Sequence, residues 1–483
     1  MTSENQSKKS VFSKNVLIYF FGGVLAAGAN FLLAPIYIRV LSDYDFGIWS
    51  KFLLFQQLFQ IIMSWGMMAA MMRLLVGVSK SEQRILIRSA IFSCILLNSI
   101  LVISIYILGS FFNLEKIIGI ENTYIIISAL ISSFFFSFVS ILMGFYIATA
   151  QAIKYRAISI VSFMLQFSLI VSFSSFNEVS FREAVSIAVV GVSLLSSFCV
   201  INLFRISGFK FSLKKSKKVL LFSLPLIVYT LVTQGYDMAV RFSLMSLITE
   251  ENFGIFSAVL LYASVPAMVS SAINLSWTPI FFKNADKWIN DNTYNKFFIS
   301  SCSLIAIICL FQIIFWQELL TIYFGYLPDI NFIFISCLCI SSWIGSTVWT
   351  GLSNPIFEKG HTKEIMIFSI KALILLLPFA FFLILNFLTL GTSISLLMYS
   401  LILCFFSFSY LKSIGIDNLP ILNIFKILIL ISVIVLVSWY LPNDFNSYIY
   451  IYKTILIMLC VIILLKPIYK DFFNLIKIID EKA

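Results

Sequence analysis

Apolar stretches of about 20 residues recur along the whole chain, separated by short polar segments. Each stretch is long enough to cross a hydrocarbon core of roughly 30 Å as a helix. The alternation of polar and apolar residues that a membrane β-barrel needs is not seen. The pattern therefore predicts an all-α integral membrane protein with about fourteen transmembrane helices, near residues 15–38, 46–72, 86–112, 122–148, 157–176, 184–204, 219–247, 254–282, 297–324, 330–352, 365–388, 391–411, 420–441 and 447–465.

A ten-residue segment occurs twice at corresponding points of this pattern. Leu41–Ser50 (LSDYDFGIWS) returns 207 positions later as Ile248–Ser257 (ITEENFGIFS), and each copy follows one apolar span and opens the next. Six predicted spans separate the copies, and an even number places both on the same side of the membrane. We therefore predict two parallel, pseudo-symmetric six-helix repeats, a layout found in transporters.

The repeat defines the predicted domains. We expect an N-terminal six-helix lobe over residues 1–206, a basic cytoplasmic linker over 207–218, a C-terminal six-helix lobe over 219–415, and two accessory helices with a cytoplasmic tail over 416–483. The lysines between residues 210 and 218 fit a linker between lobes. A site for an anionic lipid headgroup is the alternative.

Composition and charge agree with a membrane protein. Sixty per cent of the residues are hydrophobic, 11% are charged and the mean hydropathy is +1.01, which excludes an ordinary soluble enzyme. Of the 33 Lys and Arg residues, 26 fall on one side of the predicted membrane and three on the other. The positive-inside rule then places both termini in the cytoplasm, and the net charge of +11 reflects attraction to anionic lipid rather than to nucleic acid. We expect the first span to be a retained helix, because no small-residue cleavage site follows it.

The sequence offers little material for catalysis. The eight cysteines lie inside or beside apolar spans, where they act as small core residues, and the Cys337-x-Cys339 spacing does not suit a metal site on a helix. No phosphate-binding glycine loop is present, and His361 is the one histidine. The predicted loops are short, whereas a membrane glycan polymerase or ligase generally needs a large extramembrane region. We expect a transporter without cofactor or metal, and not an enzyme.

Several landmarks resemble a known family. In the first half these are Pro35–Ser42, Asp45–Trp49 and the Gly-then-Arg pattern of Trp65–Arg73. In the second half they are Leu224-Pro225, Asp237 with Arg241, Phe253–Ser257 and Trp277-Thr-Pro279. Their order resembles the polysaccharide-export, repeat-unit flippase branch of the multidrug/oligosaccharidyl-lipid/polysaccharide exporter superfamily. In that family Asp and Arg are often adjacent in helix 7, whereas here three residues separate them.

The resemblance implies two six-helix lobes around a central cavity, in the inner membrane of a bacterium. It implies flipping of an undecaprenyl-diphosphate-linked oligosaccharide from the cytoplasmic to the outer leaflet, for O-antigen (lipopolysaccharide), capsule or a related polymer. An ion gradient of H⁺ or Na⁺ would drive this transport by antiport. Membrane lipids are expected partners, and a polysaccharide polymerase and a chain-length regulator are further candidates.

Two charged residues inside predicted helix 7 are candidate transport residues, since charges are costly in a membrane. Asp237 precedes Arg241 by four positions, the favourable order for an ion pair on one helix. The pair could be structural; alternatively, Arg241 contacts the substrate diphosphate and the protonation of Asp237, the ion-coupling residue, decides whether Arg241 is available. The 207-residue offset places Asn30 at the position equivalent to Asp237.

Predicted helix 2 carries a polar stripe, formed by Gln56, Gln60 and Ser64 at four-residue steps. A cavity-lining face that hydrogen-bonds sugar hydroxyls is favoured over plain helix packing. Lys51 lies nearly opposite this stripe, and we expect it to extend its charge to the membrane interface, as we do for Lys453.

Two further basic residues are candidates for the diphosphate. Arg73 ends predicted helix 2 on the cytoplasmic side, where it could be a gate or phosphate contact or simply a topology signal. Lys371 lies two turns inside predicted helix 11, and extension of its charge to the interface competes with a substrate role.

Three other functions remain open at this stage. A flippase for the peptidoglycan lipid precursor and an ion-coupled multidrug exporter would share the fold, although the exporter cavity would be smaller and richer in acids. A membrane glycan polymerase or ligase is the alternative from another class.

Overall fold

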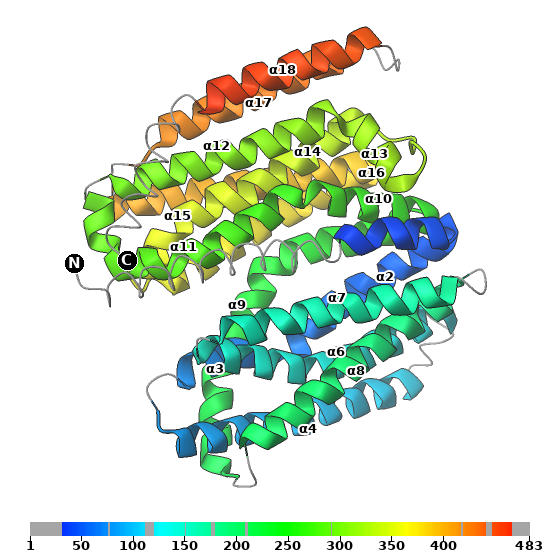
Figure 1. The fold of residues 1–483 in the computed structure, drawn as a ribbon, viewed down its shortest axis with the longest axis vertical. Helices are drawn as coiled ribbons and strands as arrows, with labels where there is room; N and C mark the ends of the chain where they lie inside the picture. The colour runs from blue at the N-terminus through cyan, green and yellow to red at the C-terminus, as the bar shows by residue number, and fades with distance from the viewer. Residues whose placement is uncertain are drawn as a thin grey trace, which may run out of the picture. The chain divides into compact units, whose positions relative to one another are not determined.

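The computed structural model describes residues 31–75, 78–111, 120–149, 151–174, 179–207, 211–290, 292–416, 419–440 and 447–465. Throughout these ranges the regular elements are helices (Figure 1). The chain forms two compact units. Unit 2 comprises Ile36–Met238 and Ile248–Ile255, and unit 1 comprises Met1–Pro35, Ala239–Leu247 and Phe256–Ala483.

Unit 2 is organised around α6 (Ile120–Ala148). This helix contacts α2 (Asp43–Met63), α3 (Met67–Leu74), α4 (Lys80–Phe111), α7 (Ala152–Ser174) and α8 (Phe181–Ser207). Small residues allow these approaches: Ser133 and Ser137 are fully buried, and a Cβ added to Gly144 would lie 2.6 Å from the carbonyl oxygen of Met68. Helices in membranes pack closely through such small residues.

Unit 1 has two central helical segments. One is α12 (Thr293–Ile314), which contacts α11 (Val265–Asn290), α17 (Ile421–Trp439) and α18 (Ser447–Leu465). The other is α14 (Phe332–Trp343), continued by a π-helical turn (Ile344–Val348) and α15 (Trp349–Glu358), which packs on α16 (Thr362–Ser413). The short α13 (Trp316–Phe324) follows α12.

The prediction of an all-α, multi-span membrane protein is confirmed. In the described part, 10 helices are long and apolar enough to cross a membrane, or 11 if α10 (Glu250–Ala263) and α11, bent by 40°, form one span. The shorter helix Ile449–Leu465 coincides with the last predicted span. Phe31–Val40 is the described end of the first, most of which lies outside the described residues.

One long helical segment contains two of the predicted spans. Within α16, Leu388 has φ 47° and ψ −119°, which are not helical values. A Cβ added to Gly391 would lie 2.1 Å from the carbonyl oxygen of Leu383, although eight residues of straight helix span about 12 Å. The chain therefore turns sharply at Leu388, between the spans predicted at 365–388 and 391–411.

Three predicted spans are interrupted where continuous helices are expected. The span predicted at 46–72 divides into α2 and α3, the span at 254–282 divides into α10 and α11 at Ser264, and the span at 297–324 divides into α12 and α13 at Phe315. Hydropathy does not detect such breaks, because apolar side chains on either side of each break continue the hydrophobic run.

Both copies of the repeated segment begin with a helix N-cap. Ser42 Oγ accepts a hydrogen bond from the Asp45 N–H at 3.1 Å, and Thr249 Oγ1 accepts one from the Asn252 N–H at 3.4 Å. A hydroxyl at this position satisfies a backbone donor that the first helical turn leaves without a partner. The polar residues of the repeat thus start α2 and α10.

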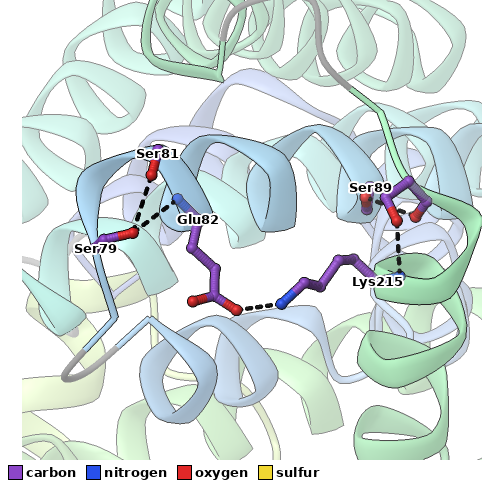
Figure 2. Close-up of polar contacts among 6 residues, drawn as sticks. Ser79, Ser81, Glu82, Ser89 and Lys215 are labelled. Atoms are coloured by element: carbon purple, nitrogen blue, oxygen red, sulfur yellow. Dashed lines mark hydrogen bonds and ion pairs between the residues drawn. The ribbon is translucent and has the colours of Figure 1, made fainter.

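The basic segment predicted as a linker is helical from Leu213 onward. This helix, α9 (Leu213–Met245), docks on α4: Lys215 forms an ion pair with Glu82, and Ser89 Oγ donates to the Ser212 carbonyl at 3.1 Å (Figure 2). Ser216 Oγ donates back to the Ser89 carbonyl at 3.0 Å. One of the divisions between the compact units falls inside α9, after Met238. The predicted lobe boundaries stay a prediction.

Candidate functional site

The backbone between α2 and α3 leaves the helical conformation. Trp65 and Gly66 have φ values of 49° and 61°, in the left-handed region that costs a non-glycine residue about 1–3 kcal/mol. The fully buried Asn98 supports this break from α4. Its Nδ2 donates to the carbonyl of Met63 at 3.1 Å and to Ser137 Oγ at 3.2 Å, and its Oδ1 accepts from Trp65 Nε1 at 2.5 Å. Asn98 therefore satisfies the Met63 carbonyl, which the break leaves without its helical partner Met67.

Gly66 also allows α9 to approach the break. A Cβ at this position would lie 2.9 Å from the carbonyl oxygen of Ser223 and 3.4 Å from Leu226 Cβ. Irregular backbone at membrane depth is tolerated only where protein covers it or where it lines a cavity. Here it does both.

A cavity of about 250 Å³ lies beside the break, within unit 2. Its walls come from the last turns of α2, the break itself, α6 and α9. None of the lining side chains carries a charge. They are Gln57, Gln60, Ile61, Ser64, Gly66, Phe136, Ile227, Thr230 and Gln234.

The polar side chains of this cavity offer both donors and acceptors. Ser64 Oγ donates to the Ile61 carbonyl at 3.2 Å and Thr230 Oγ1 donates to the Leu226 carbonyl at 2.8 Å, so each hydroxyl oxygen keeps acceptor capacity. Within the described part, the side-chain amides of Gln60 and Gln234 form no hydrogen bond. Each amide can donate and accept. The cavity therefore suits a neutral ligand that both donates and accepts hydrogen bonds.

The structure assigns the predicted polar stripe on helix 2 only partly to this cavity. Gln60 and Ser64 line it, whereas Gln56 does not: its Nε2 donates to Ser132 Oγ of α6 at 2.5 Å. Gln57 takes the place expected for Gln56. The lining positions 57, 60 and 64 follow the i, i+3, i+7 spacing of a helical face, which describes this wall better than steps of four.

The α9 wall was not predicted from the sequence. Ile227, Thr230 and Gln234 lie at the same i, i+3, i+7 spacing, and this spacing is the signal that could have identified them. Asp237 and Arg241 continue the same face toward the end of α9, because they follow Gln234 by three and seven positions. Both are half-buried and neither lines the cavity, and their roles stay predictions.

The other predicted site residues are not brought to this cavity. Arg73 lies exposed in the last turn of α3, where a cation stabilises the helix C-terminus, and Lys371 lies exposed on α16 in unit 1. Asn30 lies outside the described residues.

Two lysines expected to extend toward the membrane interface instead form ion pairs. Lys51 Nζ lies 2.5 Å from Glu250 Oε1, and Lys453 Nζ lies 2.6 Å from Glu318 Oε1. The exposed fractions of the two lysine side chains are only 9% and 6%. The prediction was wrong because it considered each lysine on its own helix. The carboxylate that pairs with it lies in the first turn of another helix, α10 for Glu250 and α13 for Glu318.

A comparison with protein families identifies the class of this membrane protein. The family model described as "Polysaccharide biosynthesis protein" matches residues 12–285, which is more than half of the chain. The chain belongs to this family. The predicted resemblance to the polysaccharide-export branch of the multidrug/oligosaccharidyl-lipid/polysaccharide exporter superfamily is thereby confirmed. No curated protein sequence matches this chain.

Solved transporter structures share the fold of this family member. The lipid II flippase MurJ, in an inward closed conformation, superposes with a TM-score of 0.70 at 14% identity, over 96% of this chain and 99% of that one. The multidrug transporter DinF-BH gives a TM-score of 0.60 at 15% identity, over 86% and 96% of the two chains. A superfamily transporter from Pyrococcus furiosus gives 0.55 at 13% identity, over 83% and 95%. The protein is thus a multi-pass membrane protein with a transporter fold.

Proposed function

We propose that this protein flips an undecaprenyl-diphosphate-linked oligosaccharide from the cytoplasmic to the outer leaflet of a bacterial inner membrane. The product would serve O-antigen, capsule or a related surface polymer, and both termini would lie in the cytoplasm. The observation that carries the proposal is the cavity of unit 2, which is uncharged and rich in amides although membrane-crossing helices surround it. Such polar groups are costly in a membrane unless a polar ligand uses them.

Transport would proceed by alternating access coupled to H⁺ or Na⁺. Arg241 is the proposed diphosphate contact and Asp237 the coupling carboxylate, one helical turn before it on α9. Protonation of Asp237 would remove its attraction for Arg241 and leave the guanidinium available to phosphate. Arg73 and Lys371 remain further candidates for attracting the diphosphate.

A second candidate function is flipping of the peptidoglycan lipid precursor. The high coverage and TM-score of the match to the lipid II flippase MurJ motivate this alternative. The two functions differ in which lipid intermediate accumulates when the protein is removed.

Deletion of the gene followed by analysis of lipid intermediates on the inner leaflet tests both candidates. Accumulation of an undecaprenyl-diphosphate oligosaccharide and loss of surface polymer are expected, and wild-type protein should reverse both. Accumulation of the peptidoglycan precursor would instead support the second candidate. If no intermediate accumulates and the surface polymer is intact, the flippase proposal is wrong.

A further inference from the structure

We infer that the unit 2 cavity is a subsite for one uncharged sugar ring of the transported oligosaccharide, and that Gln60 and Gln234 determine this preference. The inference rests on the proposed function and adds to it the class of sugar and the residues that select it. The diphosphate, on this view, binds outside the cavity.

The size of the cavity favours a single ring. Its volume is about 250 Å³. Sites for whole drug-sized ligands commonly measure about 300–1,000 Å³. A pyranose fits this space, whereas an oligosaccharide with its diphosphate does not.

The hydrogen-bonding groups match those of a sugar. A sugar hydroxyl donates one hydrogen bond and accepts others, and an N-acetyl group adds an amide of the same kind as a glutamine side chain. Gln60 from α2 and Gln234 from α9 offer amides without a hydrogen bond in the described part, and Ser64 and Thr230 offer hydroxyl oxygens. Because the two glutamines belong to different helices, they can form hydrogen bonds with different edges of one sugar ring.

The apolar side chains of the cavity provide a packing surface for a sugar ring. Phe136, Ile61 and Ile227 line the same cavity, and the Phe136 ring is partly buried against the core of unit 2. The faces of a pyranose ring carry C–H groups that pack on apolar and aromatic surfaces. Ligand sites commonly combine such a surface with a few orienting polar groups.

The absence of charge among the lining residues sets the selectivity. A uronic acid or a phosphate placed here would lose its hydration without gaining a countercharge. Neutral sugars avoid this cost. Charge selection therefore favours neutral over acidic rings at this position of the repeat unit.

The wall at the helix break is preorganised. Asn98 bonds the backbone carbonyl of Met63, just before the break, and the indole of Trp65 within it, and Gly66 packs directly against α9. A site on such a supported scaffold binds without first ordering its own backbone.

Binding to the purified full-length protein in lipid nanodiscs tests the inference with three probes. These are a short-chain isoprenoid diphosphate alone, the same lipid carrying an N-acetylhexosamine, and the same lipid carrying a hexuronic acid. We expect wild type to bind the N-acetylhexosamine probe about tenfold more tightly than the bare diphosphate, and the uronic acid probe no more tightly than the bare one. Gln60→Leu and Gln234→Leu should each remove most of the tenfold gain while the affinity for the bare diphosphate stays unchanged.

The matched control is Gln166→Leu, the same change at a half-buried glutamine of α7 that does not line the cavity. It should retain the full gain. Retained affinity for the bare diphosphate shows in the same preparation that each variant is folded. As a gain-of-function arm, Gln60→Lys should shift the preference toward the uronic acid probe.

The outcomes separate the two proposals. If wild type binds the bare and N-acetylhexosamine probes equally, or binds the uronic acid probe as tightly as the neutral one, the sugar subsite is wrong while the flippase proposal stands. If wild type binds none of the three probes, the flippase proposal fails, and the subsite with it.

Discussion

Gly47 and Gly254, the equivalent glycines of the two repeated segments, touch through their backbones. A Cβ added to Gly254 would lie 3.1 Å from Gly47 Cα, and one added to Gly47 would lie 1.9 Å from the carbonyl oxygen of Glu250. Lys51 and Glu250 join the same two segments by their ion pair. The two copies are thus partners in one contact inside unit 2, and the glycines are needed because two helix backbones meet there.

We expect Gly47→Ala to lower the apparent melting temperature of the purified protein. The new methyl group would meet a backbone carbonyl rather than a flexible side chain, and overpacking of this kind costs about 1–3 kcal/mol or more. Gly191→Ala on α8 is the control, because its Cβ would meet the nearest atom at an ordinary 3.5 Å. The control should match or exceed wild type, since alanine favours helix. Equal stability of the Gly47 and Gly191 variants would contradict the close contact.

Reversal of one charge in the Lys51–Glu250 pair should destabilise the protein, and reversal of both should restore it. Removal of one partner from a buried pair costs about 3–5 kcal/mol, and we expect less here, about 1–3 kcal/mol, because the Glu250 side chain keeps 33% exposure. Thermal unfolding of Lys51→Glu, Glu250→Lys and the double variant measures the coupling. Strictly additive losses would exclude the pair as a stabilising contact.

Lys453→Met should destabilise the protein more than Lys453→Met combined with Glu318→Gln. The single change leaves a carboxylate in a poorly hydrated setting, where Glu318 Oε2 already has no hydrogen-bond partner among the described residues. The double variant removes the charge along with its partner. The apparent melting temperatures of both variants are measured in the same detergent. A double variant that is less stable than the single one would refute the prediction.

Asn98→Leu should lower both the melting temperature of the protein and its export of surface polymer. The substitution preserves approximate volume but removes the donor to the Met63 carbonyl and the acceptor for the Trp65 indole, and each buried polar group left alone costs about 1–3 kcal/mol. Ser137→Ala is the milder control, because it removes only one of the contacts of Asn98. Melting temperature and export of surface polymer in a deletion strain are the measurements. Wild-type values for Asn98→Leu would show that the break does not depend on this side chain.

Asp237→Asn should abolish coupled transport if this carboxylate carries the ion. The amide keeps the size of the side chain but does not take up a proton or pair with Arg241 as an anion. Surface polymer production in the deletion strain gives the readout, with Asp237→Glu as the charge-preserving control. Full activity of the asparagine variant would remove Asp237 from the mechanism.

The class of fold and the approximate positions of most described helices could be predicted from the sequence. A run of about 20 apolar residues is a local property of the chain, and transfer into a membrane depends mainly on that run. The N-caps at Ser42 and Thr249 are equally local, since each hydroxyl meets an amide three residues ahead. For the same reason Gln60 and Ser64 could be predicted as members of a polar helix face.

The breaks in these helices and the partners of their polar residues depend on contacts between helices, which hydropathy does not describe. The left-handed turn at Trp65 and Gly66 is held by Asn98 from another helix, and Gln57 lines the cavity while Gln56 bonds Ser132. The carboxylates that bind Lys51 and Lys453 come from segments 199 and 135 residues away in the sequence. Hydropathy sums residues along the chain, whereas hydrogen bonds and ion pairs depend on which atoms come within about 3 Å after packing.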